Sequence, residues 1–415
     1  MSALAVKALA AIGRGEVVIV TDDKDRENEG DLIMAADAAT TESLAFFLEH
    51  TSGVICAALP GSRLDELDLP LMVSDNQEAQ RTAFTVTVDL ARGITTGISA
   101  SDRARTLRAL ADPHAVARDF VRPGHILPLR SRPGGVLERP GHTEASVDLA
   151  RLAGRQPAGV LSEVVTPDRH AMARRPELEA LALSHGLPMV TIAELRRHRL
   201  RTERHIRQVA EAPLPTRHGT FTCQAWRSEI DGVDHLALVL GDPSGGDPVL
   251  VRVHSECLTG DVFGSRRCDC GSQLDDAMAA LADAGRGVIV YLRGQEGRGI
   301  GIASKLQAYE LQDSGHDTVD ANLHLGLPVD SREYGTAAKV LLELGVERMR
   351  LITNNPAKCD DLGAYGIEIS ERVALPARPT PENITYLETK RRRMGHLLGG
   401  LETSVGYGSY KSVRQ

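Results

Sequence analysis

Three cysteines in the second half of the chain have the spacing of a metal site. Ten residues separate Cys257 from Cys268, and Cys270 follows after one more residue. A structural zinc site usually has four protein ligands, whereas a catalytic site keeps three and leaves one position for water. The three thiols therefore favour a catalytic zinc ion that carries an activated hydroxide, unless His254 provides a fourth ligand. Three buried, inert thiols are the alternative, but this polar segment next to glycine is a poor core segment.

A glycine-rich segment, Arg293–Gly301, lies between a predicted strand and a predicted helix. Glycine allows a ligand to approach the backbone closely, and arginine can pair with two phosphate oxygens at once. Its spacing matches neither of the two common nucleotide-binding glycine motifs. Charged loops at 330–332 and 353–358 also follow predicted strands. Each alone would be an ordinary surface loop, but together these loops indicate a polyphosphate ligand.

An acidic loop forms a second candidate site in the first half of the chain. Residues 22–31 contain six carboxylates in ten residues, directly after a predicted buried strand. Such charges repel one another unless water or cations screen them. Mg²⁺ prefers oxygen ligands and keeps several waters, so one or two of these carboxylates would be enough to bind it. A solvated acidic loop is the alternative that composition alone allows.

Two Pro-Gly-His turns, Arg122–His125 and Arg139–His142, support this second candidate site. The second turn opens a predicted helix, and an arginine beside a helix N-terminus is a good phosphate site. A lone histidine is more often structural. Two histidines in the same kind of turn, in a chain that also has an acidic loop, favour a functional site.

Short strands and helices alternate along the whole chain. We expect a buried strand at Val17–Thr21 and a half-exposed strand at Thr82–Asp89, where apolar and polar residues alternate. Serine and threonine at helix starts predict three N-caps: Ser101 for a helix over 102–111, Thr143 for one that ends near 154, and Ser272 for one through 284. Further strands are expected at 287–292 and 349–353, and a helix at 334–344.

The fold class is therefore mixed α and β (α+β and α/β), with two domains in tandem, each a mixed β-sheet packed by helices. The boundary is expected near 200, where Arg196–Arg207 carries six arginines against one glutamate and Pro213–Pro215 precedes a strand-rich stretch. We interpret the arginine run as a solvated helix end that leads into a linker. The predicted domains are residues 1–201 and 202–415, with a flexible tail after about 395.

Composition excludes several classes of protein. The chain has 415 residues, a net charge of −8 and only 3% aromatic residues, which argues against a nucleic-acid partner. No apolar run approaches the ~18–20 residues that span a membrane, and the first residues do not read as a secretion signal. Six cysteines are too few for a disulfide scaffold of this length. A cytoplasmic protein without membrane or nucleic-acid partners is expected.

Five motifs of the first half match one family. Residues 1–200 closely resemble 3,4-dihydroxy-2-butanone 4-phosphate synthase, which converts ribulose 5-phosphate to that product and formate. The resemblance implies two Mg²⁺ or Mn²⁺ ions, held by Glu27 and His142. It also implies that His125 and Glu163 are catalytic. The matching motifs are Asp22–Asp31, Thr82–Val86, Thr96–Ala104, Gly141–Ala145 and Pro157–Glu163.

The same resemblance implies the residues that contact the sugar phosphate. They are Arg26, Glu27, Asp31, Arg139, Gly141, His142, Thr143 and Glu163. The chain departs from the family pattern at Val164–His170, where the family has an Asp-Gly type of turn, and at Ser162, where cysteine is commoner. Neither departure involves a named ligand, and we expect the domain to be active.

Residues ~205–395 resemble GTP cyclohydrolase II through motifs at 252–257, 268–274, 294–301, 317–318, 330–332 and 351–358. That enzyme opens the imidazole ring of GTP and releases formate and pyrophosphate. The resemblance implies Cys257, Cys268 and Cys270 as ligands of one Zn²⁺, Asp330 as proton acceptor and Arg332 as nucleophile. The implied GTP-binding residues are Arg252, Val253, His254, Ser255, Glu256, Gln273, Glu296, Gly297, Arg298, Thr318, Thr353 and Lys358.

The tandem order of the two resemblances is that of the bifunctional enzymes of riboflavin biosynthesis, and it implies a homodimer that acts on two small molecules. Two alternatives remain open at this point. One is a GTP cyclohydrolase II whose first domain is an inactive scaffold, which the altered Val164–His170 stretch would support. The other is a zinc protein that binds nucleic acid through Arg196–Arg207, against which the acidic net charge argues.

Overall fold

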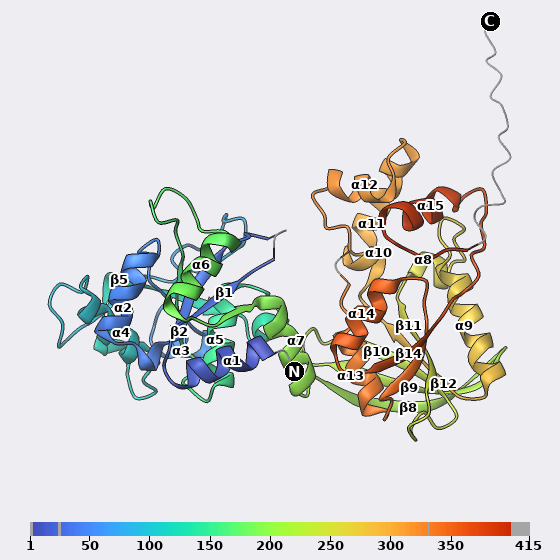
Figure 1. Cartoon of the computed structure of the whole chain (residues 1–415), viewed down its shortest axis with the longest axis horizontal. Coiled ribbons are helices and arrows are strands. Elements are labelled where there is room, and N and C mark those ends of the chain that lie inside the picture. The colour runs from blue at the N-terminus through green and yellow to red at the C-terminus, as the bar shows by residue number, and fades with distance from the viewer. Residues whose placement is uncertain (1–2, 24–25, 331, 400–415) are drawn as a thin grey trace, which may run out of the picture. The chain divides into compact units, whose positions relative to one another are not determined.

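The computed structural model describes residues 3–23, 26–330 and 332–399. The chain divides into two compact units, Met1–Thr202 and Glu203–Gln415, and each contains one seven-stranded sheet. Both sheets mix parallel and antiparallel neighbours and are packed by helices (Figure 1). The predicted fold class, two tandem domains with mixed sheets, is confirmed.

The strands of the first unit combine two parallel pairs with antiparallel neighbours. Strand β3 runs parallel to β5 and β1 runs parallel to β7, while the remaining pairs are antiparallel. As a result β1 ends, β2 begins and β6 ends at the same edge of the sheet. In spatial order the strands are β4 (Val88–Leu90), β5 (Phe120–Ser131), β3 (Cys56–Pro60), β6 (Gly159–Glu163), β2 (Gly30–Ala35), β1 (Val18–Thr21) and β7 (Met189–Thr191).

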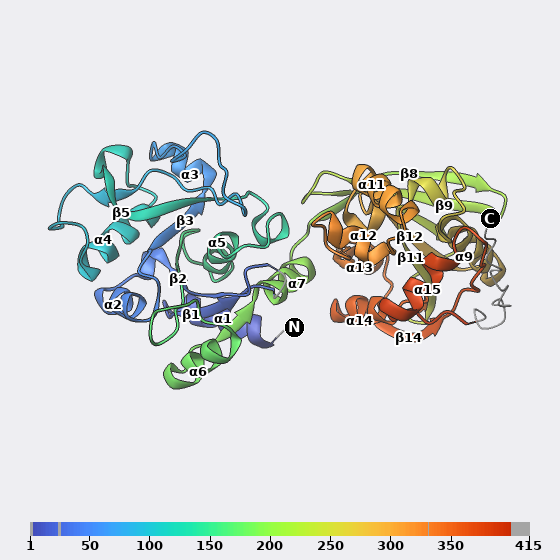
Figure 2. The ribbon, with the colours of Figure 1, turned by 90° about the horizontal axis from the view of Figure 1, so that it is seen from above.

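Helices cover both faces of this sheet because its strands are apolar on both sides. Val18 and Val20 of β1 pack with α1 (Ala3–Gly13), α5 (His142–Leu152) and α7 (Ile192–Thr202). Ile19, between them, packs on the opposite face with α2 (Thr41–His50), α3 (Gly61–Glu66), α4 (Ala100–Ala111) and α6 (Arg175–His185). Figure 2 shows α5 and α7 on one side of the strands and α2 and α4 on the other.

The sheet of the second unit is parallel in one half and antiparallel in the other. Strands β14, β13, β11 and β12 run parallel, whereas β12, β10, β9 and β8 pair antiparallel. The carboxyl ends of the parallel strands therefore share one edge. In spatial order the strands are β14 (Glu368–Val373), β13 (Arg348–Ile352), β11 (Val249–Ser255), β12 (Gly287–Leu292), β10 (Asp234–Leu240), β9 (Gly219–Ser228) and β8 (Ile206–Thr216).

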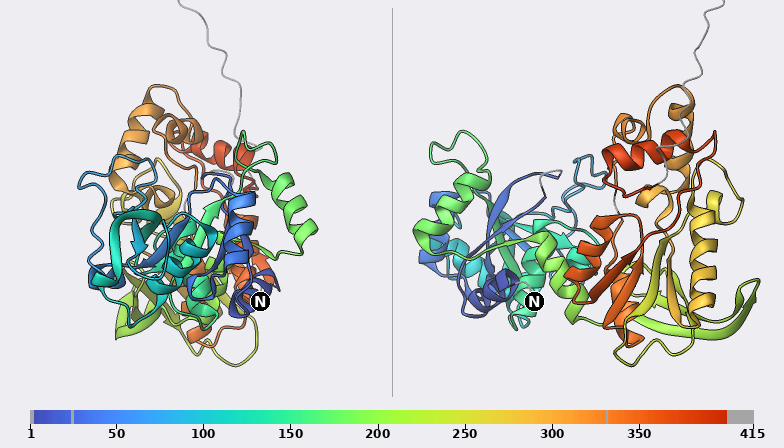
Figure 3. Two further views of the ribbon diagram at one scale, coloured as in Figure 1. Left: turned by 90° about the vertical axis from the view of Figure 1, so that its left-hand side faces the viewer. Right: turned by 45° about the vertical axis from the view of Figure 1, so that its right-hand side comes forward.

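Helix α9 (Cys270–Ala284) lies on one face of this second sheet, where its Ala277 and Leu281 pack with Leu250 and Ile289. Helices α13 (Gly335–Glu343) and α14 (Pro356–Ala364) lie on the other face, as Figure 3 also shows. The remaining helices follow the carboxyl ends of the parallel strands or close the chain: α8 (Leu258–Asp261), α10 (Glu296–Gly299), α11 (Ile302–Asp313), α12 (Thr318–His324) and α15 (Ile384–Arg393).

All three predicted N-caps are wrong by two or three residues. Ser99, not Ser101, caps α4, because its side chain accepts a hydrogen bond from the Asp102 N–H. Helix α5 starts after Gly141, which leaves Thr143 buried in the first turn. Asp269 precedes α9, and the Ser272 hydroxyl donates back to its carbonyl.

Two expected strands also have different bounds. Only Val88 and Asp89 of the alternating stretch Thr82–Asp89 belong to a strand, β4, which ends at Leu90, while Phe84 and Thr85 form isolated bridges. Strand β8 begins at Ile206 and includes Pro213 and Pro215, which is possible because β8 lies at the edge of its sheet.

The arginine run is less solvated than its composition indicates. Arg199 on α7 is buried, and its guanidinium donates to the Asp148 carboxylate of α5 at 2.8 Å and to the Gly134 carbonyl. The expectation of a solvated helix end is wrong at this position. The pair connects the last helix of the first unit to the helix that begins with His142.

Gly124 on β5 provides a test of the packing of β4 against β5. A Cβ atom at this position would lie 2.0 Å from the Val88 carbonyl carbon and 2.2 Å from the Asp89 nitrogen. We expect Gly124→Ala to destabilise the protein by about 1–3 kcal/mol and to lower its melting temperature in calorimetry of the full chain. Gly363→Ala on α14 is the control, because nothing lies within 4 Å of its added Cβ atom. Equal melting temperatures for the two variants would contradict the close approach of the strands.

Candidate active sites

The first site lies where β1 and β6 end and β2 begins. Asp31 on β2 is directly paired with Glu163 on β6 in the antiparallel register. His142, the first residue of α5, faces both Asp31 and the loop that follows β1. Its Nδ1 atom lies 3.7 Å from Glu27 Oε2 and 3.9 Å from Asp31 Oδ1. The fold therefore brings together four of the residues predicted for this site.

Burial and mutual interaction shift the pKa values of these groups. Burial raises the pKa of Asp31 to about 7. The nearby His142 acts to lower this pKa, and the charge of Glu163 acts to raise it. Burial acts to lower the pKa of His142. The interactions with Asp31 and Glu27 have the larger effect, and they raise this pKa to about 9. The interaction with His142 at 3.7 Å lowers the pKa of Glu27. The site thus concentrates negative charge around one imidazole.

This donor set fits a hard divalent cation. One ligand atom each of Asp22, Glu27 and His142 lies within 4.8 Å of the others. Asp31 Oδ1 and His142 Nε2 are buried and have no hydrogen-bond partner among the described residues. Buried polar atoms without partners are costly unless an ion or water completes them. Carboxylate oxygens and an imidazole are donors that Mg²⁺ and Mn²⁺ accept.

The other residues predicted to contact the sugar phosphate lie on either side of His142. Arg26 donates to Asp22 at 3.0 Å and also pairs with Glu27. Arg139 donates to Glu144 at 2.8 Å, while Gly141 precedes α5 and Thr143 is buried in its first turn. A Cβ atom at Gly141 would lie 2.4 Å from Arg139 Nη1, so glycine is needed there for this arrangement.

His125 lies apart from this cluster. It is on β5, and its Nδ1 atom is 2.6 Å from Asp89 Oδ2. Within the described residues, no hydrogen bond or ion pair connects His125 to Glu27, His142 or Glu163. Within a single chain, Glu163 therefore lies with the predicted metal ligands Glu27 and His142, whereas His125 is not part of this cluster.

The departures from the family pattern are structurally mild. Val164 is buried and bridges to Thr51, and Val165 bridges to Met172. Residues 167–170 form an exposed turn, which Thr166 closes by hydrogen bonds to Asp168 and to the backbone of Ala171. The Ser162 hydroxyl donates to Thr51 at 2.9 Å. The neighbouring Ser52, which the sequence did not single out, donates to Glu163 Oε2 at 2.9 Å. Ser52 therefore orients the carboxylate of Glu163.

The second site begins with the three thiols. Cys257 follows β11 and Cys270 opens α9, and the three sulfur atoms lie within 4.8 Å of one another. The Sγ atoms of Cys257 and Cys268 are 3.7 Å apart. Zn–S bonds of ~2.3 Å in a tetrahedron place two sulfurs about 3.8 Å apart, so the thiols fit one zinc ion.

His254 does not complete this set. Its Nε2 atom lies 3.1 Å from both carboxylate oxygens of Asp261, and its ring stacks on Tyr291. The structure thus favours three protein ligands, which leaves one coordination position for water or substrate.

Lys305 on α11, which the sequence did not single out, stabilises the sulfur cluster. Its Nζ atom lies 3.2 Å from Cys257 Sγ and 2.6 Å from Glu296 Oε1. Hydrogen bonds from Cys268 and Cys270, with the charge of Lys305, hold the pKa of the Cys257 thiol far below its ordinary value. Cys257 is therefore held as a thiolate, whereas the hydrogen bonds to Cys257 raise the pKa values of Cys268 and Cys270.

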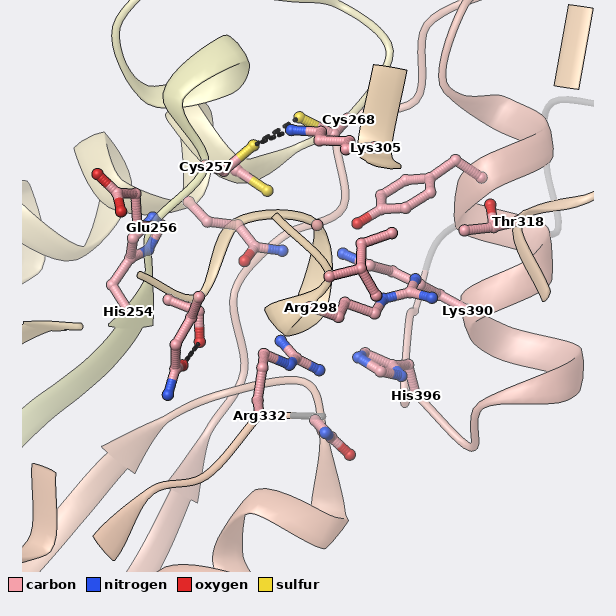
Figure 4. A pocket seen from close by; sticks show the side chains of 18 of the residues that line it. His254, Glu256, Cys257, Cys268, Arg298, Lys305, Thr318, Arg332, Lys390 and His396 are labelled. Atoms are coloured by element: carbon pink, nitrogen blue, oxygen red, sulfur yellow. Dashed lines mark hydrogen bonds between the residues drawn. The ribbon is translucent and has the colours of Figure 1, made fainter. Parts of the chain in front are cut away.

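A cavity beside the thiols is lined by cationic side chains, and Figure 4 shows two of them, Arg298 and Arg332, directed into it. Arg298 has φ +65°, in the left-handed region, and both terminal nitrogens of its guanidinium are buried without a hydrogen-bond partner among the described residues. Lys358 is buried and donates to the Val253 carbonyl at 2.9 Å. Burial and two neighbouring arginines, Arg252 and Arg332, lower the pKa of Lys358 well below its ordinary value. Several basic side chains that are buried around one cavity favour an anionic ligand.

Most of the residues predicted to bind GTP line this cavity. Three predicted site residues do not. Val253 contributes only its carbonyl to Lys358, Glu296 binds Lys305 and the Leu258 N–H, and Asp330 pairs with Arg332. The predicted residues in the lining are Arg252, His254, Ser255, Glu256, Cys257, Cys268, Cys270, Gln273, Gly297, Arg298, Thr318, Arg332, Thr353 and Lys358.

The cavity also has lining residues near the C-terminal end that the sequence did not indicate. Tyr386, Lys390 and His396 belong to α15 and the residues that follow it. They had no signal in the sequence, because nothing there indicates that this segment returns to the sheet edge. Of the tail expected to be flexible after about 395, residues 400–415 lie outside the described residues, and Leu398 is buried.

Comparison with known proteins matches each unit to one family. Residues 6–198 match the model of 3,4-dihydroxy-2-butanone 4-phosphate synthase, and residues 207–374 match that of GTP cyclohydrolase II. The riboflavin biosynthesis proteins RibBA of Mycobacterium marinum and Mycobacterium tuberculosis are 60% and 59% identical over 401 residues, which is 95% of this chain and 94% of each relative. The crystal structure of RibBX, a two-domain 3,4-dihydroxy-2-butanone 4-phosphate synthase from A. baumannii, has a TM-score of 0.70 and 35% identity; it covers 89% of this chain and 99% of that one.

Fold and sites thus define a bifunctional enzyme that joins a lyase, 3,4-dihydroxy-2-butanone 4-phosphate synthase, to a hydrolase, GTP cyclohydrolase II. The chain belongs to the RibBA family of riboflavin biosynthesis proteins. One reaction converts ribulose 5-phosphate to the butanone phosphate and formate, and the other hydrolyses GTP to a diaminopyrimidinone ribosyl phosphate, formate and pyrophosphate. Within the described part of the chain, no helix has both the length and the apolar character needed to cross a membrane.

The Ser52 contact predicts a kinetic effect in the first unit. Ser52→Ala removes the hydroxyl that orients Glu163, and a hydrogen bond to a charged group contributes about 1.5–3 kcal/mol. We expect the kcat of formate release from ribulose 5-phosphate to fall at least about tenfold, while GTP hydrolysis is unchanged. Ser184→Ala on α6 is the control, because that hydroxyl donates only to the Leu181 carbonyl. Equal kcat values for the two variants would contradict a role for Ser52.

Proposed function

We propose that the two reactions run at two separate sites with two different metals. Residues 1–201 would carry the synthase and residues 202–415 the cyclohydrolase. The observation that carries this proposal is the contrast between the donor sets, carboxylate oxygen with imidazole in one unit and three thiols in the other. Hard oxygen donors select Mg²⁺ or Mn²⁺, whereas thiolates select Zn²⁺.

In the first unit, Glu27 and His142 would hold the Mg²⁺ or Mn²⁺ pair. When bound, these ions would stabilise the enediolate charge that develops on the sugar phosphate. Buried Asp31, whose Oδ1 atom is 3.9 Å from His142 Nδ1, would lie beside these ions. The residues proposed to contact the sugar phosphate are Arg26, Glu27, Asp31, Arg139, Gly141, His142, Thr143 and Glu163.

Glu163 and His125 are the proposed catalytic residues of this reaction. Glu163 has its carboxylate oriented by Ser52, next to the Asp31 strand position. His125 has its ring held by Asp89, and it would have to approach the other groups from outside the cluster of a single chain.

In the second unit, Cys257, Cys268 and Cys270 would hold one Zn²⁺. The ion would supply an activated hydroxide for attack on the purine ring and then on the formamide. The cationic cavity next to the thiols would hold the triphosphate and the base. The residues proposed to bind GTP are Arg252, Val253, His254, Ser255, Glu256, Gln273, Glu296, Gly297, Arg298, Thr318, Thr353 and Lys358, of which Val253 and Glu296 would act from outside the lining.

Asp330 is the proposed proton acceptor and Arg332 the proposed nucleophile on the α-phosphorus. Arg332 Nε donates to Asp330 Oδ1 at 2.8 Å. Burial opposes the charge of Arg332, but the bond to Asp330 prevails and raises its pKa above the ordinary value of arginine. Nucleophilic attack would therefore require Asp330 to remove a proton from Arg332, whereas a role as phosphate clamp needs no such transfer.

We also propose that the chain acts as a cytoplasmic homodimer on small molecules only. Leu71, Met72 and Val73 form an exposed apolar stretch in the first unit, of the kind that subunit interfaces cover. All six cysteines are free, which suits a reducing compartment that keeps a thiolate metal site intact.

The experiment for the first site measures formate from each substrate with the same protein. Glu27→Gln removes a proposed metal ligand and keeps the size of the side chain. We expect formate release from ribulose 5-phosphate with Mg²⁺ to fall at least about 100-fold, because loss of a ligand weakens the metal site. Formate release from GTP should remain within twofold of the wild type.

Glu16→Gln is the matched control, since Glu16 is exposed and pairs only with Arg14. A Glu27→Gln variant that converts ribulose 5-phosphate at the wild-type rate would overturn the proposed metal ligand. If the wild-type chain released formate only from GTP, the first unit would be an inactive scaffold, and the turn at 164–170 the first place to look for the cause.

A further inference from the structure

The C-terminal segment 375–398 lies beyond the part of the chain that matches the cyclohydrolase model, which ends at residue 374. One residue of the sheet edge, Asn354, fastens it at both ends. The side-chain amide of Asn354 makes two hydrogen bonds with the backbone of Leu375, at 2.9 and 3.0 Å. The backbone carbonyl of Asn354 accepts a hydrogen bond from the Leu397 N–H at 2.8 Å. Because Asn354 follows Thr353 of the cavity lining, the segment is held at the rim of the cavity.

Helix α15 within this segment is fixed to two other walls of the cavity. Lys390 Nζ donates to Asp269 Oδ1 at 2.8 Å, and Asp269 lies between two of the zinc-ligand cysteines. Arg393 donates to Asp320 at 2.8 Å and also pairs with Asp317, at the start of α12. The helix is therefore connected both to the thiol turn and to the helix that carries Thr318.

The side chains that this segment directs inward are polar. Figure 4 shows Lys390 and His396 facing the same space as Arg298 and Arg332. The Tyr386 ring contacts two cations, with Lys390 Nζ at 4.5 Å and the Arg298 guanidinium at 5.8 Å from its centroid. These cation–π contacts attract both cations to the ring without adding a negative charge.

His396 is an imidazole among cations. Its Nδ1 atom lies 3.1 Å from the Met394 carbonyl, so this atom carries the hydrogen and Nε2 remains as the second polar atom of the ring. Burial and the charges of Lys390, Arg332 and Arg298 lower its pKa to about 4, which leaves the ring neutral in the empty cavity. The carboxylates paired with two of these cations are Asp269 and Asp330. Polyphosphate in the cavity would offset the cations and allow Nε2 to bind a proton and donate to a phosphate oxygen.

We propose that His396 is a phosphate-binding residue of the GTP site, presented by a C-terminal strap of residues 375–398. The inference rests on the proposed location of GTP in this cavity. Tyr386 and Lys390 are positioning residues, since they act on Arg298 and on the thiol turn. The ligand chemistry that His396 recognises is a nucleoside triphosphate through its phosphates, not through its base.

The test compares two inhibitors of GTP hydrolysis by the full-length, zinc-loaded protein. One inhibitor is guanosine and the other is a non-hydrolysable methylene analogue of GTP. For His396→Leu we expect the inhibition constant of the analogue and the KM for GTP to rise about tenfold, while guanosine inhibits as it does the wild type. His396→Gln, which restores a neutral donor, should recover part of this loss. Arg392→Gln, an exposed position on α15, is the control and should behave as the wild type.

Proton uptake gives a second readout. Calorimetry of analogue binding at pH 7, in buffers of different ionisation enthalpy, should show proton uptake by the wild type that is reduced in His396→Leu. Unchanged analogue affinity in His396→Leu would overturn the proposal. Equal weakening of guanosine and analogue would also overturn it, because it would indicate a structural role. A separate variant, Arg298→Gln, tests the cavity itself: if that variant keeps its analogue affinity, the proposed location of GTP fails.

Discussion

Repulsion between like charges that the fold forces together is the constraint on which both sites depend. In the first unit, Asp31 and Glu163 are direct strand partners, and Asp31 is buried to the point that its pKa rises to about 7. In the second unit, the buried cations Arg252 and Lys358 share one cavity. Charge of the opposite sign stabilises each cluster, so the first site favours divalent cations and the second favours polyphosphate.

The two sheets position these charges in the same way. Strands β11, β12 and β13 run parallel, so the segments that follow them meet at one edge of the second sheet. In the first sheet, the ends of β1 and β6 and the start of β2 also share an edge. The residues of each site are far apart in sequence. Strand register pairs Asp31 with Glu163, and helices that begin at the same edge add His142 in the first unit and Thr318 in the second. Apolar packing on both faces of each sheet then keeps the register fixed.

Residue type and spacing were enough to predict the three thiols, the acidic loop with His142 and the two-domain mixed fold. They were not enough for features that depend on tertiary contacts. Ser52 orients Glu163 from the loop that follows α2, and Lys305 reaches Cys257 from α11. His396 reaches the cavity on a distant segment that contacts with Asn354, Asp269 and Asp320 hold in place. The N-cap of α4 was missed because Ser99 and Ser101 give the same local signal, and those of α5 and α9 because no side chain caps either helix.

The central claim is that one chain holds two sites that depend on different metals. Selective removal of zinc with a thiolate-competing chelator, followed by assay of both reactions in excess Mg²⁺, tests it most directly. The account predicts that pyrophosphate release from GTP is lost and returns with one equivalent of Zn²⁺, while formate release from ribulose 5-phosphate stays at its starting rate. Loss of both activities together, or of neither, would contradict two independent metal sites.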